Sequence, residues 1–131
     1  MSVTDARVLI VDDDDSVRHL FERAFVREGF TVNGVATGQE ALDVMQGEAP
    51  ALIVLDLMLP FMNGIEVLAA VRQHPSLATI PVLVVTATAT SAYDLREFSP
   101  LRVIRKPCEL FRLVANARDM IRDRPNEPSQ I

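Results

Sequence analysis

Five polar residues stand at the ends of short, mostly apolar runs in this 131-residue chain. Asp12 and Asp13 follow VLIV, Asp56 follows ALIVL, Thr86 follows PVLVV, and Lys106 closes LRVIRK. Carboxylate oxygens are the ligands that Mg²⁺ prefers, and an aspartate can also act as a nucleophile that forms an aspartyl-phosphate. A hydroxyl can hydrogen-bond a phosphoryl oxygen, and a lysine ammonium can pair with it. These residue types therefore indicate metal-assisted phosphoryl transfer.

The run of four aspartates, residues 12–15, also has a simpler interpretation as a solvated turn and helix start. Carboxylates at that place are favoured as caps and by the helix dipole. This suits Asp14 and Asp15, at the expected helix entrance, better than it suits the strand-terminal pair Asp12 and Asp13. We therefore expect the first two aspartates to hold a metal ion and the last two to serve the helix. The glycine and glutamate of a calcium-binding loop are missing.

Structural interpretations also exist for the other three residues. Asp56 suits a cap of the loop that follows, Thr86 is an ordinary β-branched strand residue, and Lys106 is an ordinary surface charge. Lys106 is nevertheless the one lysine beside twelve arginines. A compact ammonium can pair with phosphate where a planar guanidinium does not fit, which favours a role for Lys106 in a site. His19 and His74 fall in a helix and a loop, and no role is assigned to them.

Short apolar runs alternate with segments of helical periodicity, which is typical of βα units around a parallel sheet. In such open α/β sheets, ligands bind beyond the carboxyl ends of the strands. We therefore expect the five polar residues to lie along one edge. The expected strands are 7–11, 31–35, 51–56, 80–86 and 101–106. The expected helices run from the first strand to Gly29, over 37–46, 65–73 and 110–121, with weak helical character in ATATSAYDLREF.

Composition narrows the class of protein further. About half of the residues are hydrophobic (49%), and the net charge is −5, which argues against direct nucleic-acid binding. The single cysteine, Cys108, excludes an intramolecular disulfide and fits a reducing compartment. No leader or membrane-length apolar stretch is seen. We expect a soluble cytoplasmic protein without membrane attachment, with one domain over 1–124 and a polar tail over 125–131.

Four separated motifs, VLIVDDD, LIVLDLMLPFMNG, PVLVVTA and IRKP, span residues 8 to 121 with their helices. In this set and order the sequence resembles the receiver domains of two-component response regulators. The resemblance implies a flavodoxin-like (βα)5 fold, doubly wound, with a parallel five-stranded sheet of order 2-1-3-4-5. It also implies a stand-alone receiver of the phosphoacceptor type.

Site roles carried over from that family fall on matching residues of this sequence. The resemblance makes Asp56 the phosphorylated residue and a Mg²⁺ ligand. It makes Asp13 a direct Mg²⁺ ligand, Asp12 a ligand largely through water, and the backbone carbonyl of Met58 a further ligand. Mg²⁺ is thus the implied cofactor.

Thr86 and Lys106 are implied to contact the phosphoryl group, with a cis peptide bond before Pro107 aiming the lysine. The phosphoryl donor would be a phosphohistidine on a sensor histidine kinase or a histidine phosphotransfer protein. Phosphorylation would switch binding of an unidentified downstream protein, and the receiver would be a monomer or a phosphorylation-dependent dimer. The domain would catalyse only its own phosphorylation and dephosphorylation.

Departures from the family pattern concern the output face. Val103 stands where many members have a switch aromatic residue, and the short segment between Thr86 and Lys106 predicts an abbreviated or irregular fourth helix. Cys108 and Asn63 replace a common phenylalanine and a common aspartate.

Two other functions fit parts of the sequence. An aspartyl-phosphate-forming phosphatase or phosphotransferase would need a second acid near Asp56, and Leu57 and Met58 stand there instead. A degenerate receiver that acts only as an interaction module would not need the complete set of polar residues.

Overall fold

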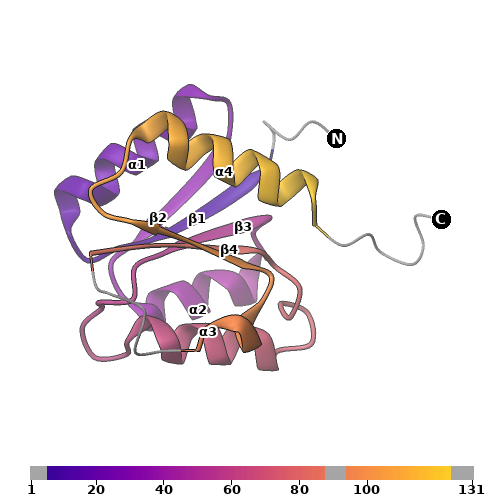
Figure 1. The fold of residues 1–131 in the computed structure, drawn as a ribbon. Coiled ribbons are helices and arrows are strands. Elements are labelled where there is room, and N and C mark those ends of the chain that lie inside the picture. Colours follow the sequence, from indigo (N-terminus) through magenta and orange to yellow (C-terminus); the bar gives the residue numbers. More distant parts are fainter. Residues whose placement is uncertain (1–5, 88–93, 125–131) are drawn as a thin grey trace.

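The computed structural model describes residues 6–87 and 94–124. They form a three-layer α/β fold in which a five-stranded parallel sheet lies between helices (Figure 1). The strands are β1 (Arg7–Val11), β2 (Thr31–Val35), β3 (Leu52–Leu55), β4 (Val82–Thr86) and β5 (Leu101–Arg105). The α-helices are α1 (Asp15–Arg27), α2 (Gly38–Gly47), α3 (Gly64–Gln73) and α4 (Leu110–Arg122). The strand order is β2-β1-β3-β4-β5, so the predicted flavodoxin-like order is confirmed.

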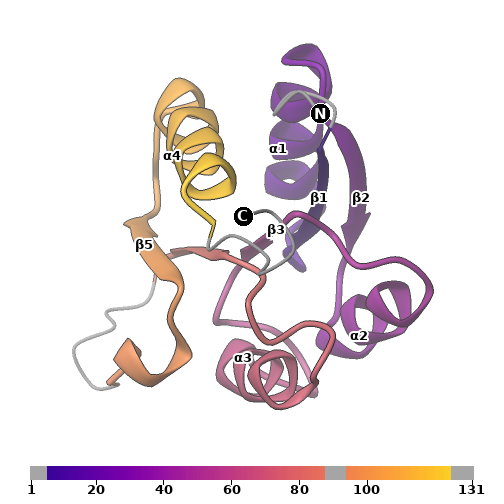
Figure 2. The same ribbon diagram turned by 90° about the vertical axis from the view of Figure 1, so that its right-hand side faces the viewer.

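Two hydrophobic cores fill the spaces on either side of the sheet. Helices α1 and α4 cover one face, and α2 and α3 cover the other (Figure 2). Strand side chains alternate between the two faces: Val8 and Ile10 of β1 pack toward α1 and α4, whereas Leu9 and Val11 pack toward α2 and α3. Because both faces are buried, the central strands are continuously apolar, as is usual for a parallel sheet.

Element boundaries follow from local chemistry. Helix α3 begins one residue earlier than predicted because Asn63 is its N-cap: the Asn63 side chain accepts from the backbone N–H of Glu66, and the Glu66 side chain accepts from the N–H of Asn63. Strand β4 begins directly after Pro81. The carbonyl of Pro81 accepts a hydrogen bond from the N–H of Ile53, but proline has no N–H with which to continue the ladder. Asparagine at position 63 is therefore a functional cap in place of the common aspartate.

The connection from β4 to β5 differs from the other crossovers. The described part of it contains a 3₁₀ helix, Arg96–Phe98, and residues 88–93, where weak helical character was expected, lie outside the described residues. The predicted fold class is confirmed, and residues 6–87 and 94–124 contain its five strands together with four α-helices. An irregular fourth helical segment agrees with the short stretch between Thr86 and Lys106.

Arg72 of α3 fixes that connection. Its guanidinium donates to the backbone carbonyls of Phe98 (2.6 Å) and Pro100 (2.8 Å), and also to those of Ala78 (3.2 Å) and Ile80 (2.7 Å). The planar fork of five N–H donors suits this task, because irregular backbone inside a protein needs partners for its carbonyls. Arg72 therefore ties α3 to the loops before β4 and β5.

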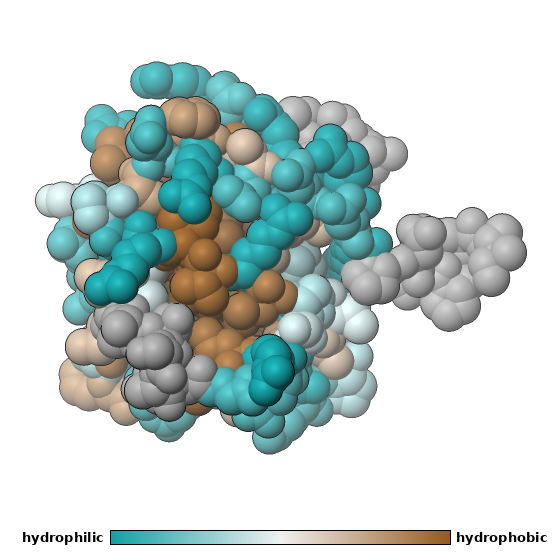
Figure 3. Space-filling view, in the orientation of Figure 1, coloured by the Kyte–Doolittle hydropathy of each residue, from teal (hydrophilic) through white to brown (hydrophobic). Residues whose placement is uncertain are grey.

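Hydrophobic side chains are exposed on one face of the molecule. In the space-filling view, hydrophobic side chains gather between the two helix layers, with hydrophilic ones above and below (Figure 3). Val103 of β5, which stands at the position of the switch aromatic, is 41% exposed.

No helix among the described residues is long and apolar enough to span a bilayer. The predicted tail, residues 125–131, lies outside the described residues.

Candidate functional site

Backbone hydrogen bonds continue the sheet for one residue beyond the strand ends. The N–H of Asp12 donates to Val35 (3.1 Å) and that of Asp56 donates to Val11 (3.0 Å). On the far side, the N–H of Lys106 donates to Thr86 (3.0 Å). These bonds hold the terminal residues in the parallel ladder, so their side chains emerge at a common edge, as the strand-end argument predicted.

Asp56 is the centre of this edge, and both of its carboxylate oxygens accept hydrogen bonds. Oδ1 accepts from the hydroxyl of Thr86 (2.9 Å) and from the backbone N–H of Met58 (2.9 Å). Oδ2 accepts from the ammonium of Lys106 (2.7 Å). Asp56 is only 7% exposed and Thr86 only 1%. A carboxylate this deep in the protein is stable because it has donors on both oxygens.

Lys106 joins Asp56 to a second buried carboxylate. Its Nζ lies 2.6 Å from Oδ2 of Asp12, which is 2% exposed, while Oδ1 of Asp12 accepts from the N–H of Asp14 (2.9 Å). Lys106 thus lies between the two aspartates that directly follow β1 and β3. We call Asp12, Asp56, Thr86 and Lys106 the carboxylate site.

Burial, hydrogen bonds and neighbouring charges shift the pKa values of Asp12 and Lys106. Burial, the largest influence, raises the pKa of Asp12, and the neighbouring negative charge of Asp56 acts in the same direction, while hydrogen bonds from Lys106 and Asp14 oppose the rise. For Lys106, burial alone lowers the pKa, but the hydrogen bonds and charges of the two aspartates outweigh it, so the net pKa is raised. Lys106 therefore keeps its proton in this position.

Two of the four consecutive aspartates, Asp14 and Asp15, lie at the helix start as predicted. Asp14 is the N-cap of α1, and its side chain accepts from the N–H of Val17 (3.1 Å). Asp15 lies in the first turn, where a negative charge suits the helix dipole. Asp12 turns inward to Lys106, whereas Asp13 is exposed. The helix roles of Asp14 and Asp15 are confirmed, and the metal role of Asp13 stays a prediction.

Arg18 is a site neighbour that the sequence analysis missed. Its guanidinium donates to the backbone carbonyl of Asp12 (2.9 Å) and to the carboxylate of Asp15 (2.7 Å). The i, i+3 spacing from Asp15 was the available signal. This side chain holds the turn between β1 and α1 and supplies a positive charge beside the aspartates.

Whether the site fits Mg²⁺ depends on its donors. In residues 6–87 and 94–124, no group of three or more His, Cys, Asp or Glu side chains is arranged to hold a metal ion. Mg²⁺ usually keeps several waters and is bound by one or two carboxylates with phosphate oxygens. The Asp12 and Asp56 carboxylates already share one cation, the Lys106 ammonium. The donor chemistry therefore fits Mg²⁺, although the protein alone offers no complete coordination cage.

The predicted peptide geometry beside the site is also present. The bond between Lys106 and Pro107 is cis, and a second cis bond, which was not predicted, precedes Pro100. Met58 follows the phosphoacceptor candidate by two residues, and its side chain is 62% exposed.

Comparison with known proteins places this geometry in context. A family model described as response regulator receiver domain matches residues 8–118. The transcriptional regulatory protein SrrA of Staphylococcus aureus (strain NCTC 8325 / PS 47) is 33% identical over 117 residues, which cover 80% of this chain and 47% of SrrA. The chain thus spans about half the length of the curated relatives that it matches.

Solved structures share the fold. The chemotaxis protein CheY4 of Vibrio cholerae superposes with a TM-score of 0.82 at 26% identity, over 88% of this chain and 98% of CheY4. The N-terminal domain of a response regulator receiver protein from Methanoculleus marisnigri JR1 has a TM-score of 0.71 at 26% identity, over 92% of this chain and 98% of that domain.

Proposed function

The chain belongs to the response regulator receiver domain family of two-component systems, and we propose on this basis that Asp56 is its phosphoacceptor in a phosphorelay. The observation that carries the proposal is the environment of Asp56. It is a buried carboxylate at a strand end, and a hydroxyl (Thr86) and an ammonium (Lys106) both donate to it. Phosphoryl transfer requires positioning and charge neutralisation more than covalent chemistry by the protein.

The phosphoryl donor is a phosphohistidine on a sensor histidine kinase or a histidine phosphotransfer protein. One carboxylate oxygen of Asp56 attacks phosphorus, an O–P bond forms, the N–P bond to the imidazole breaks, and the released imidazole nitrogen takes up a proton. On the acceptor side the Asp56 carboxylate is the nucleophile, and the Lys106 ammonium donates a direct hydrogen bond to its Oδ2.

Thr86 and Lys106 change partners during the transfer. Both donate to Asp56 oxygens before it. After it, the negative charge lies mainly on the phosphoryl oxygens, which become the stronger acceptors. The Thr86 hydroxyl and the Lys106 ammonium then follow the charge, and this movement carries the signal into β4 and β5.

The ligands for Mg²⁺ would be the carboxylates of Asp12, Asp13 and Asp56 and the backbone carbonyl of Met58. A bound Mg²⁺ would neutralise phosphoryl charge and would lower the repulsion between the donor phosphate and the aspartates. Without such neutralisation, the negative charges of Asp12 and Asp56 would repel an approaching anion.

The readout is a change in protein binding, not turnover of an outside substrate. Val103 lies exposed on β5, next in the sheet to the strand that ends in Thr86. A downstream protein that contacts this edge would sense the movement of Thr86 without a switch aromatic. We place the domain in the cytoplasm, as a monomer or a phosphorylation-dependent dimer, without direct contact to nucleic acid or membrane.

The two alternative functions have less support. A phosphatase acting on outside substrates needs a free second acid, whereas the acid closest to Asp56 in the hydrogen-bond network is Asp12, which Lys106 holds. A degenerate receiver that acts only as an interaction module has no use for four polar side chains at one edge. In this site Thr86 and Lys106 both donate hydrogen bonds to Asp56, and Lys106 also donates to Asp12.

The proposal is tested by incubating the protein with Mg²⁺ and acetyl phosphate and measuring its intact mass. The wild type should gain one phosphoryl group, and Asp56→Asn should gain none. Asp43→Asn, an exposed aspartate of α2 bonded to Gln39, is the matched control and should be phosphorylated like the wild type. Equal labelling of wild type and Asp56→Asn, or no labelling of either, would refute the assignment.

A further inference from the structure

The turn between β1 and α1 holds Asp13 between two hydrogen-bonded peptide groups. The carbonyl of Asp12, in the peptide group before Asp13, accepts a hydrogen bond from the Arg18 guanidinium (2.9 Å). The N–H of Asp14, in the peptide group after Asp13, donates to Oδ1 of Asp12 (2.9 Å). The backbone at one residue has only two soft dihedral angles, and these are set by the planes on either side. The direction in which the Asp13 side chain leaves the backbone is therefore fixed by Arg18 and Asp12.

Asp13 does not hold itself in place. Its side chain is exposed, and within residues 6–87 and 94–124 it has no hydrogen bond or ion pair. Asp12, in contrast, is also held by its N–H, which donates to Val35, and by its Oδ2, which accepts from Lys106. Loss of the contact from Arg18 therefore affects the placement of Asp13 more than that of Asp12.

Arg18 is well ordered for this task. Its side chain is only 13% exposed, although α1 is a surface helix. Two different nitrogens of the guanidinium are used: Nη1 donates to the Asp12 carbonyl, and Nη2 donates to the carboxylate of Asp15 (2.7 Å). Because the guanidinium is planar and its N–H groups point in fixed directions, each contact restrains the other. Asp15 therefore orients Arg18 as well as serving the start of the helix.

We propose that Arg18 is a positioning residue for Mg²⁺ binding: by holding the carbonyl of Asp12 it sets the direction of the Asp13 carboxylate and thereby the affinity for Mg²⁺. The inference rests on the proposed function, in which Asp13 is a ligand of Mg²⁺. Arg18 itself does not touch the metal ion. Residues that hold metal ligands by hydrogen bonds typically change metal affinity about 10- to 100-fold when they are replaced.

The charge of Arg18 acts in the opposite direction. A positive charge beside a cation site repels the cation, so removal of the charge alone would tighten the binding of Mg²⁺. The Asp15 carboxylate lies 2.7 Å from the guanidinium and balances its charge, so the repulsion that remains at Asp13 is small. Geometry and charge thus predict opposite changes in Mg²⁺ affinity when Arg18 is replaced by an uncharged residue.

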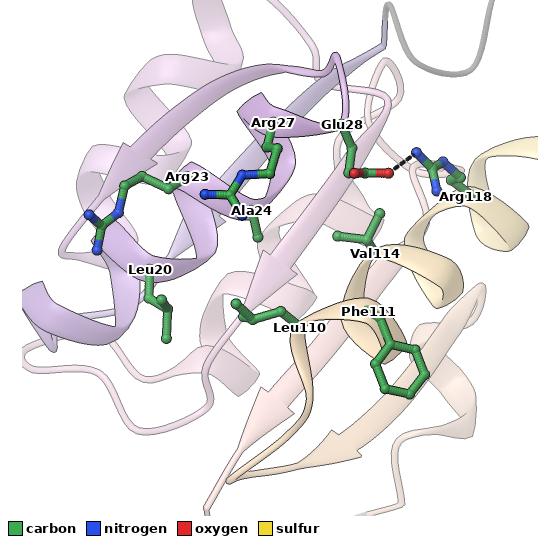
Figure 4. Close-up of a pocket in the computed structure, with 9 residues that line it drawn as sticks. All are labelled: Leu20, Arg23, Ala24, Arg27, Glu28, Leu110, Phe111, Val114 and Arg118. Carbon is green, nitrogen blue, oxygen red and sulfur yellow. Dashed lines mark hydrogen bonds and ion pairs between the residues drawn. The ribbon is translucent and has the colours of Figure 1, made fainter.

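Two other arginines provide matched controls. Arg23 is an exposed residue of the same helix and lines the groove between α1 and α4 (Figure 4). Arg118 of α4 forms an ion pair with Glu28 (2.6 Å), which is the dashed contact in Figure 4. Glu28 caps the far end of α1 from the β1–α1 turn. Replacing Arg23 removes a charge from α1, and replacing Arg118 removes an ion pair, while the turn keeps its contacts.

The test is a calorimetric titration of the unphosphorylated full chain with Mg²⁺, without a phosphodonor. Asp13→Asn defines the signal that depends on this ligand. Arg18→Met and Arg18→Lys should each weaken Mg²⁺ binding about tenfold, because the lysine keeps the charge but cannot place two N–H donors in a fixed fork. Arg23→Met and Arg118→Met should bind Mg²⁺ like the wild type. Amide spectra of the metal-free variants should differ from the wild type only around the β1–α1 turn, which shows that they are folded.

A second measurement separates positioning from a general structural role. Arg18→Lys should be phosphorylated by acetyl phosphate more slowly than the wild type at limiting Mg²⁺. At saturating Mg²⁺ its rate, followed by intact mass, should return to the wild-type value, because only the affinity for the metal is changed. A rate deficit that persists at saturating Mg²⁺ would contradict the proposed role.

Equal Mg²⁺ affinity of the wild type and both Arg18 variants would overturn the inference. Tighter binding in Arg18→Met together with normal binding in Arg18→Lys would show that Arg18 acts only through its charge. A similar loss in Arg118→Met would show that the affinity follows general stability. Absence of Mg²⁺ binding by the wild type would overturn this inference and the metal part of the proposed function together. Normal Mg²⁺ binding without phosphorylation of Asp56 would overturn the proposed phosphoacceptor alone.

Discussion

Lys106 Nζ lies 2.7 Å from Oδ2 of Asp56, although 50 residues separate the two in the chain. The same ammonium also holds Asp12, so one cation balances two buried carboxylates. Removing one partner from such a buried group leaves uncompensated charge and is costly. The lysine therefore has a structural role in the unphosphorylated state as well as its proposed role in phosphoryl binding.

Lys106→Met should destabilise the fold by about 3 kcal/mol at neutral pH, because Asp12 and Asp56 lose their shared cation. Burial already raises the pKa of Asp12, and loss of Lys106 raises it further. A carboxyl whose folded-state pKa lies above its unfolded value binds protons more tightly when folded, so the variant should regain stability as pH falls from 7.5 toward 5. Urea unfolding at several pH values measures this.

Arg105→Met, at the exposed residue beside the lysine, is the control for Lys106→Met and should lose little stability at any of these pH values. In the wild type, Lys106 has a raised pKa, so its contribution is complete below the ordinary lysine pKa and is lost as pH rises through the folded value. A pH-independent loss of stability in Lys106→Met would contradict the bridge.

Mg²⁺ should stabilise the protein in thermal unfolding, since a ligand that binds only the folded state adds about 1.4 kcal/mol at ten times its Kd. Asp13→Asn should abolish this Mg²⁺ effect while leaving metal-free stability nearly unchanged, because Asp13 is exposed. Asp43→Asn should respond to Mg²⁺ like the wild type. If Asp13→Asn keeps the full effect, Asp13 is not a ligand.

Asp14→Ala should cost about 1 kcal/mol through loss of the α1 N-cap. Phosphorylation of the Asp14→Ala variant by acetyl phosphate should stay near the wild-type level, because the Asp14 side chain bonds to Val17 and not to the carboxylate site. Urea unfolding and intact-mass measurement give the two quantities. Loss of phosphorylation in a folded Asp14→Ala variant would show that the four aspartates do not divide as described.

Arg72→Met should destabilise the fold by about 3 kcal/mol, since four backbone carbonyls lose a charged donor. Arg72→Lys should rescue little, because one ammonium cannot reproduce the planar fork. Chemical denaturation measures both variants, with Arg112→Met as the exposed control. A loss below 1 kcal/mol in Arg72→Met would mean that water replaces the guanidinium.

Much of the fold could be predicted because its signals are local. Strands β1 and β2 have the predicted bounds, since their apolar or alternating runs end at clear helix or turn signals. The connection after Thr86 could not be predicted in the same way, because its 3₁₀ helix depends on carbonyl contacts with Arg72, 26 and 28 residues away. Nothing in the spacing of Arg72 indicates those contacts.

The sequence by itself determined which residues end the strands. It therefore also determined which polar residues reach one edge of the parallel sheet, namely Asp12, Asp13, Asp56, Thr86 and Lys106. Strand ends are encoded locally by hydrophobic periodicity. Only the tertiary structure decided how those side chains pair: Lys106 bonds to Asp12, 94 residues away, while Asp13 faces solvent. It also brought α1 and α4 together around a groove, because contacts between distant segments depend on strand order and helix packing, which no local pattern specifies.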